Sequence, residues 1–249
     1  MPAEKTLAIV LRVIDFSESS CVVTLFTRDF GKITGLAKGA RRPKGPFESA
    51  LDLLSIVRLM VIRKSSDALD LLTEAKLEQR FRASGRDLVR LYAGYYVIEL
   101  LSDLTHDDDP HPELFEAAVK TLRGLDTDAH VPTALLRFEL AALNILGHRP
   151  TLDLCAGCGE TVPNHPRVPF GLLSGGVLCS QCREGKRLVI SLSQKARVAL
   201  LREFQGGEVP LEIDREVRGE MRGLLNQYVC HLLGHRPKMH SFFGLLMTG

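Results

Sequence analysis

The stretch CVVTLFTRDFGKITGLAKG, residues 21–39, places two short runs rich in Val, Ile, Leu and Thr on either side of the turn sequence RDFG. Three further runs of this kind lie within residues 6–80, separated by turn material such as SESS and RKSSD: LAIVLRVIDF (7–16), LDLLSIVRLMVIRK (51–64) and LDLLTEAKLE (69–78). Five strands in about 75 residues match an OB-type barrel, in which closure of the sheet removes exposed strand edges. An SH3-like barrel has a similar strand count, and periodicity does not separate the two.

Beyond about residue 84 the apolar period becomes helical. In the first predicted helix the apolar residues recur at steps of three and four, which gives one apolar face: Leu88, Leu91, Tyr95, Ile98 and Leu101. Ser191 with Gln194 resembles a capping box for a later helix, and Asp214 is suited to cap the last one. We therefore predict an α+β chain, in which a five-stranded OB-type β-barrel (1–80) precedes an α-helical domain (81–249) with an inserted four-cysteine zinc module (153–186).

Composition limits the classes of protein. The chain has 249 residues, of which 45% are hydrophobic and 25% are charged, with 32 Lys and Arg against 30 Asp and Glu. This composition excludes a wholly disordered chain. No apolar run reaches the roughly 18 residues of a membrane-spanning helix, and the first residues, MPAEKTLAIV, lack the features of a secretory signal. We expect a cytoplasmic protein with no membrane contact.

Four of the six cysteines fall within residues 155–182, CAGCGETVPNHPRVPFGLLSGGVLCSQC. The spacing is C-x2-C, twenty residues, then C-x2-C, so Cys155, Cys158, Cys179 and Cys182 can surround one Zn²⁺ tetrahedrally at about 2.3 Å. Two disulfides are the alternative, which a reducing compartment disfavours. Four cysteines close the coordination shell and leave no position for water, so the predicted zinc is structural and not catalytic.

A basic segment lies between Gly31 and Phe47 and contains no Asp or Glu. Residues 1–64 carry 11 Lys and Arg against 6 Asp and Glu, although the whole chain has a net charge of only +2. A cationic loop on a small barrel suits a nucleic-acid phosphate backbone, whereas the simpler interpretation is a solvated loop. Phe30 and Phe47 flank the loop and are the aromatic residues nearest to it for base stacking. The candidate DNA contacts are Lys32, Lys38, Arg41, Arg42 and Lys44.

Catalytic motifs are missing from the sequence. There is no G-x-x-x-x-G-K-[ST], no G-x-S-x-G and no G-x-G-x-x-G. Asp107, Asp108 and Asp109 are followed by two prolines, which favours a solvated turn between helices over a Mg²⁺ site. We predict a protein that is not an enzyme and has no small-molecule substrate.

Several segments together resemble the RecO family of recombination-mediator DNA repair proteins, in the family's order and over nearly the whole chain. VVTLFTRDFGKITGLAKGARR (22–42) is similar to the family's signature of a strand, Thr-x-x-x-Gly-Lys and a Gly-Ala-Arg-Arg loop. RFELAALNILGHRPTLDLCAGCG (137–159) and FGLLSGGVLCSQC (170–182) resemble the two halves of its cysteine region. Lys238 and Ser241 are similar to a Lys-x-x-Ser near its C terminus, although the ending SFFGLLMTG is less basic than is common in relatives.

The resemblance implies an N-terminal OB-fold, a helical domain and an inserted zinc module. It also implies binding of single- and double-stranded DNA, annealing of complementary strands and assembly with RecR. With RecR, and sometimes RecF, such proteins help to load RecA onto DNA coated by single-strand-binding protein. Two other classes remain open: a zinc-containing adaptor scaffold with only incidental nucleic-acid contact, and an RNA-processing or translation factor with an OB domain.

Overall fold

The computed structural model describes residues 2–43, 45–47, 49–64, 68–83, 87–127, 129–205 and 214–242. The chain divides into two compact units, and the boundary between them falls within helix α3 (Val131–Ile145). One unit comprises Met1–Phe138 with Pro237–Gly249, and the other comprises Glu139–Arg236. Among the described helices, none is long and apolar enough to cross a membrane.

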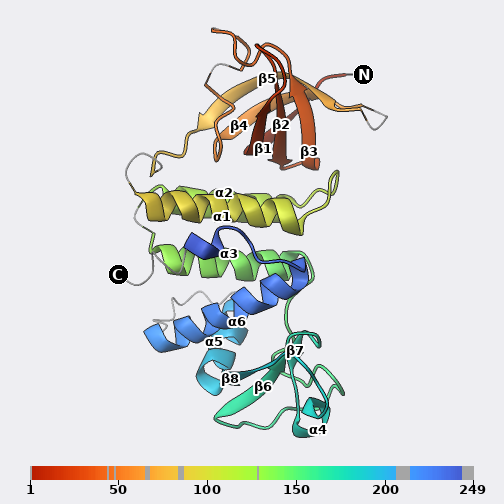
Figure 1. The fold of residues 1–249 in the computed structure, drawn as a ribbon, viewed down its shortest axis with the longest axis vertical. Coiled ribbons are helices and arrows are strands. Elements are labelled where there is room, and N and C mark those ends of the chain that lie inside the picture. Colours follow the sequence, from red (N-terminus) through yellow and green to blue (C-terminus); the bar gives the residue numbers. More distant parts are fainter. Residues whose placement is uncertain are drawn as a thin grey trace. The chain divides into compact units, whose positions relative to one another are not determined.

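The first unit contains a closed barrel with the strand order β1-β2-β3-β5-β4 (Figure 1). Its strands are β1 (Glu4–Asp15), β2 (Cys21–Thr27), β3 (Gly31–Ala37), β4 (Ile56–Ile62) and β5 (Asp70–Gln79). β3 pairs with β5 in parallel, and the other pairs are antiparallel. The predicted five-stranded OB-type barrel is confirmed.

Alternation along the strands separates the barrel interior from its outer face. In β2 the residues Cys21, Val23 and Leu25 belong to the core, while Val22 and Thr24 between them are half-buried on the outside. Cys21 is only 5% exposed, and burial raises the pKa of its thiol. Cys21 is therefore an inert core residue, as predicted.

Helices α1 (Leu88–Leu104) and α2 (Pro112–Leu125) lie below the barrel in Figure 1. Asp87 caps α1, and its carboxylate accepts hydrogen bonds from the backbone of Val89 and Arg90. The predicted apolar face of α1 is buried only toward the C-terminal end of the helix: Ile98 and Leu101 are buried, whereas Leu88 is 62% exposed. The helix is apolar around most of its circumference, so the pattern alone does not select a face. The side chains that are buried are Ala93, Tyr96, Val97, Ile98, Leu100 and Leu101.

The C-terminal Lys-x-x-Ser segment packs on α1. The backbone N–H groups of Lys238 and Met239 donate to the Glu99 carboxylate at 2.7 and 3.0 Å. The ring of His240 hydrogen-bonds the buried Tyr96 hydroxyl at 3.0 Å. These contacts give the segment a structural role in the first unit.

The second unit contains a three-stranded sheet and helices. The sheet has the order β7-β6-β8, formed by β6 (Arg167–Gly171), β7 (Gly176–Val177) and β8 (Val189–Ser193). The helices besides α3 are α4 (Ser180–Arg183), α5 (Gln194–Phe204) and α6 (Arg215–Leu233). The predicted cap at Ser191 is wrong: Ser191 lies in β8, and Ser193 caps α5 by accepting from the Ala196 N–H at 3.2 Å. The predicted Asp214 cap of α6 is confirmed.

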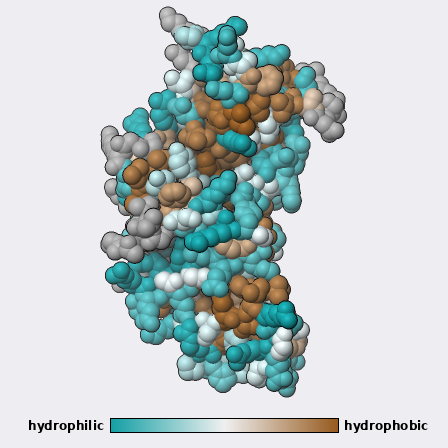
Figure 2. Space-filling view, in the orientation of Figure 1, coloured by the Kyte–Doolittle hydropathy of each residue, from teal (hydrophilic) through white to brown (hydrophobic). Residues whose placement is uncertain are grey.

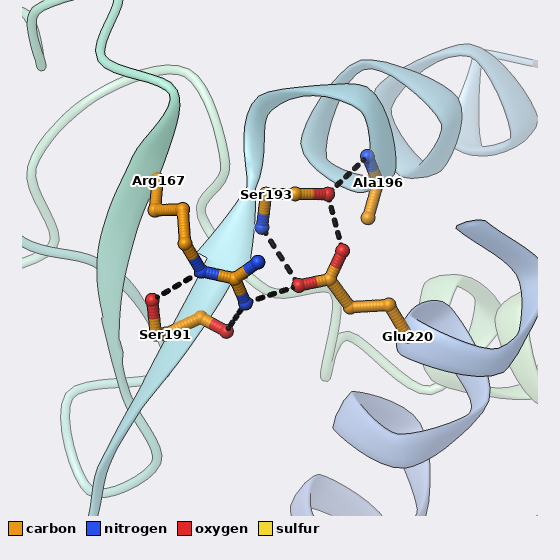
Figure 3. Close-up of polar contacts among 5 residues, drawn as sticks. All are labelled: Arg167, Ser191, Ser193, Ala196 and Glu220. Atoms are coloured by element: carbon orange, nitrogen blue, oxygen red, sulfur yellow. Dashed lines mark hydrogen bonds and ion pairs between the residues drawn. The ribbon is translucent and has the colours of Figure 1, made fainter. Parts of the chain in front are cut away.

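A polar cluster joins α6 to this sheet (Figure 3). The Glu220 carboxylate accepts from the Ser193 N–H at 2.9 Å, from the Ser193 hydroxyl and from the Arg167 guanidinium at 2.6 Å. Burial alone would raise the pKa of Glu220, but the hydrogen bonds and charge of Ser193 and Arg167 outweigh burial and lower it. Glu220 is therefore an ionised anchor for the strands next to the cysteine region.

Candidate metal centre and nucleic-acid interface

The four predicted ligands come together in the second unit. The sulfur atoms of Cys155, Cys158, Cys179 and Cys182 all lie within 4.8 Å of one another, and those of Cys158 and Cys179 are 3.9 Å apart. Four thiolates around Zn²⁺ at about 2.3 Å would be separated by about 3.8 Å. The donor chemistry and the spacing both fit one tetrahedral metal ion.

Backbone turns position the sulfur atoms. A 2.8 Å hydrogen bond from the Gly159 N–H to the Cys155 carbonyl closes the first turn. Cys179 is the N-cap of α4, and its sulfur accepts from the Cys182 N–H at 3.4 Å. A Cβ at Gly157 would lie 3.0 Å from the Cys182 sulfur, so only glycine lets the two turns approach without displacement.

The cluster favours one thiolate even without a cation. Burial opposes ionisation of Cys155, but N–H groups of Cys179, Gly157 and Cys158 donate toward its sulfur and lower its pKa to about 6. Hydrogen bonds with the other three thiols raise the pKa of Cys182 to about 12. A bound cation would take the place of the shared protons and stabilise all four thiolates.

Arg197 of α5 supports the entry to the cysteine region and was not identified from the sequence. It is 6% exposed, and it donates to the carbonyls of Leu152 at 2.6 Å and Asp153 at 3.1 Å. One feature of the sequence could have indicated the burial of Arg197. It lies three residues before Leu200, on the helical face where apolar residues are expected.

Lys32, a predicted DNA contact, lies at the junction of the barrel and α1. Its ammonium group donates to the carbonyls of Ser102 and Thr105 at 2.7 and 2.8 Å, and it pairs with Asp107 at 3.5 Å. Only 15% of its side chain is exposed. A cation bound to the last carbonyls of a helix stabilises that helix end. We therefore assign Lys32 a structural role and leave it out of the proposed contact set.

The turn Asp107–Asp109 packs against the same end of β3. The Asp108 N–H donates to the Lys32 carbonyl at 3.0 Å, and the Asp108 carboxylate pairs with Arg63. Gly31 has φ of 71°, and a Cβ there would lie 2.2 Å from the Asp109 carbonyl oxygen. The acidic turn lies between α1 and α2 as expected, but it is a contact with the barrel and not simply a solvated loop.

The other predicted cations lie at the opposite end of β3. Lys38, Arg41 and Arg42 are exposed on the loop that follows the strand, and Lys44 lies outside the described residues. The Arg41 N–H donates to the Ser19 carbonyl at 3.1 Å, and its guanidinium pairs with Asp15 at 2.9 Å. Within the described part of the chain Lys38 and Arg42 have no ion-pair partner. These side chains can meet an external anion.

Phe30 and Phe47, which flank the loop in the sequence, are not the exposed aromatic residues beside it. Phe47 is 2% exposed in the barrel core, and Phe30 lies under the Arg63 guanidinium at 5.4 Å. Phe16 is instead 65% exposed, on the turn between β1 and β2 that contacts the basic loop. The run 7–16 predicts Phe16 at the end of a strand, but β1 ends at Asp15, because an apolar run does not reveal which of its residues lies beyond the sheet.

Comparison with known proteins covers both units. Residues 1–81 match the family model Recombination protein O N terminal, and residues 85–241 match Recombination protein O C terminal. The chain is 41% identical to the DNA repair protein RecO of Rhodopirellula baltica, with 95% of this chain and 97% of the relative covered. It is 36% identical to that of Myxococcus xanthus, with 94% of each covered, and 32% identical to that of Halalkalibacterium halodurans, with 97% and 94% covered. The chain therefore belongs to the RecO family of DNA repair proteins.

Proposed function

We propose that this protein binds single- and double-stranded DNA and anneals complementary strands without catalysing a covalent step. The observation that carries the proposal is the group of exposed cations, Lys38, Arg41 and Arg42, at one end of the barrel in a chain of the RecO family. Neutralising the phosphates of two strands lowers their repulsion while bases search for partners. Lys44, in the same basic segment, belongs to the proposed contact set.

The salt dependence follows from the number of phosphates met. Each phosphate contact on a single strand contributes about 0.7 to the slope of log K against log salt. Contacts from Lys38, Arg41 and Arg42 would give a slope of roughly −2, and a fourth from Lys44 would give roughly −2.8. Lys32 adds nothing, because α1 already occupies its ammonium group.

Family membership supports a role with other repair proteins. We propose that the chain assembles with RecR, and with RecF where it takes part, and helps to load RecA onto DNA coated by single-strand-binding protein. In this role the protein acts in the cytoplasm, at the nucleoid. Strand annealing measured with and without RecR and single-strand-binding protein tests the partners separately from the DNA contact.

The metal is proposed to be one structural Zn²⁺ held by Cys155, Cys158, Cys179 and Cys182. The close approach of the four sulfurs supports it. Zn²⁺ accepts four thiolates in a closed tetrahedral shell, and in such sites its binding energy contributes directly to folding. The ion would join the two cysteine turns and take no part in a reaction.

The test is annealing of complementary oligonucleotides by the full chain carrying Arg41→Glu, Arg42→Glu and Lys44→Glu. We expect the annealing rate to fall at least about tenfold, because charge reversal repels both strands. The matched control reverses three exposed cations in the second unit, Arg183, Lys186 and Arg187, and should change the rate less than about twofold. Annealing by the loop variant at the unsubstituted rate would overturn the proposal.

A further inference from the structure

In the described part of the chain, helices α1 and α2 cover one end of the outer face of β1, β2 and β3. At the covered end Phe26 packs near Phe115 of α2, with ring centroids 6.4 Å apart, and Lys32 binds the end of α1. Toward the other end the outward residues of β2 and β3 are half-buried and lie in register across the strands, with Val22 opposite Leu36 and Thr24 opposite Thr34. This part of the face is open to a ligand.

The open part continues onto β1. Ile14 lies opposite Val22 and is 44% exposed, and Arg12 lies opposite Thr24 and is also exposed. The outward side chains of β1–β3 thus form an apolar row, Ile14–Val22–Leu36, with a polar row, Arg12–Thr24–Thr34, beside it. Figure 2 shows hydrophobic residues gathered over the barrel strands.

Phe16 stands at the edge of this face. The N–H groups of Phe16 and Ser17 both donate to the Ser20 carbonyl, at 2.9 and 3.1 Å, which fixes the backbone of the turn. Phe16 is 65% exposed although hydrogen bonds hold the backbone of its turn. Keeping a large apolar ring in water is unfavourable, so a ligand that covers the ring gains free energy.

The charges around Phe16 favour an anionic ligand. Among the described residues of this end, Arg12, Lys38, Arg41 and Arg42 are exposed cations, while Asp15, which pairs with Arg41, and Glu18 are carboxylates. A ligand that offers a flat apolar face together with a negative backbone suits a ring beside cations. Unpaired bases on a phosphate backbone have both properties, whereas the base faces of a duplex are already stacked.

We infer that Phe16 stacks on an unpaired base of a bound strand, and that the open face of β1–β3 makes this end of the barrel selective for single-stranded over double-stranded nucleic acid. This role rests on the proposed DNA binding and specifies single-stranded nucleic acid as the ligand of this face. Phosphates of either form meet the cations, but only a single strand gives the Phe16 ring a partner.

The first test uses the lack of tryptophan in the chain. Phe16→Trp in the full chain provides a single tryptophan, at the edge of the face, whose emission can be excited apart from that of the tyrosines. We expect an unlabelled single-stranded oligonucleotide to quench its emission, and a duplex of the same sequence to leave it nearly unchanged, because stacking on a base brings the two ring systems into contact. Leu173→Trp, at a position that is 60% exposed in the second unit, is the control and should not respond.

The second test measures affinity. Phe16→Ala should weaken single-strand binding about 5- to 150-fold, the range measured for loss of one base–aromatic stack, and change duplex binding less than about twofold. Phe16→Tyr should restore single-strand affinity because it keeps the ring. Phe16→Leu should not, because it is apolar but has no aromatic face.

The outcomes separate the two proposals. If the unsubstituted chain binds neither form of DNA, the proposed function fails. If it binds DNA but Phe16→Ala leaves single-strand affinity unchanged, or weakens both forms equally, the stacking role alone is overturned. Quenching of Phe16→Trp by RecR and not by DNA would also overturn it, and would identify the ring as a protein contact.

Discussion

The cysteine cluster and the basic loop are both turns that present functional atoms, but they hold those atoms differently. At the cysteine cluster backbone N–H groups of Gly157 and Cys179 fix the Cys155 sulfur, which is 2% exposed. On the basic loop the backbone is fixed by Ser19 and Ser20, while Lys38 and Arg42 extend into solvent. A metal ion demands fixed ligand distances, whereas a phosphate backbone of variable path is better met by mobile cations. Substitutions at the cysteine cluster should therefore reduce metal binding and stability, whereas substitutions on the basic loop should reduce DNA affinity.

The largest effect is expected from Cys155→Ser. Three thiolates and a hydroxyl bind Zn²⁺ far more weakly, and the metal contributes about 10 kcal/mol in small zinc modules. The variant should lose its metal, and amides of residues 151–193 should exchange with solvent much faster. Elemental analysis and hydrogen exchange measure the two effects.

Cys230→Ser is the control, because Cys230 lies on α6 outside the cluster. It should keep about one metal ion per chain, the number expected for a single Cys₄ site. Retention of a full metal equivalent by Cys155→Ser would show that the cluster is not the binding site.

A smaller effect is expected from Lys32→Met. The substitution keeps the length of the side chain but leaves the carbonyls of Ser102 and Thr105 without their donor. We expect the first unit to lose about 2–3 kcal/mol of its free energy of unfolding, measured by denaturant titration, while DNA affinity stays within about twofold. A stable Lys32→Met protein with weakened DNA binding would return Lys32 to the contact set.

Glu220→Gln removes a hydrogen-bonded carboxylate of the second unit, and its effect on stability should depend on pH. The pKa of Glu220 lies below its ordinary value of 4.5, so its stabilisation is present above about pH 4.5 and is lost as the pH falls further. The amide should cost about 1–2 kcal/mol at neutral pH, because charge-assisted hydrogen bonds from Ser193 and Arg167 become weaker. Unfolding followed at several pH values should show the difference shrinking in acid. If the difference in the free energy of unfolding between the two proteins did not change with pH, the charge of Glu220 would not be the source of the stabilisation.

The smallest effect is expected from Lys38→Met, the counterpart of Lys32→Met at the exposed end of β3. Because the Lys38 side chain is exposed, with no ion-pair partner in the described residues, the free energy of unfolding should change by less than about 0.5 kcal/mol. Single-strand affinity should fall a few-fold, with the salt slope reduced by about 0.7. If the two lysine variants behaved alike, the division of the family signature into a structural end and a contact end would be wrong.

Local patterns predicted the barrel and the cysteine cluster. The alternation of a strand involves only a few consecutive residues, and C-x2-C spacing restricts where two sulfur atoms lie. Both patterns therefore predict structure without knowledge of the tertiary contacts. The role of Lys32 depends on carbonyls some seventy residues away, which no local pattern reports. The spacing of apolar residues does not separate the buried from the exposed part of α1, because the helix is apolar on most sides. The exposure of Phe16 depends on where the sheet stops, which an apolar run does not report.

The measurement that tests the central claim most directly is the salt dependence of single-strand binding by the full chain and by its Arg41→Ala, Arg42→Ala variant. If the basic end of the barrel meets the DNA backbone, the unsubstituted chain should show a slope of log K against log salt of roughly −2 or steeper, and the variant a slope less steep by about 1.4. Equal slopes for the two proteins would contradict the account and place the DNA contact elsewhere on the molecule.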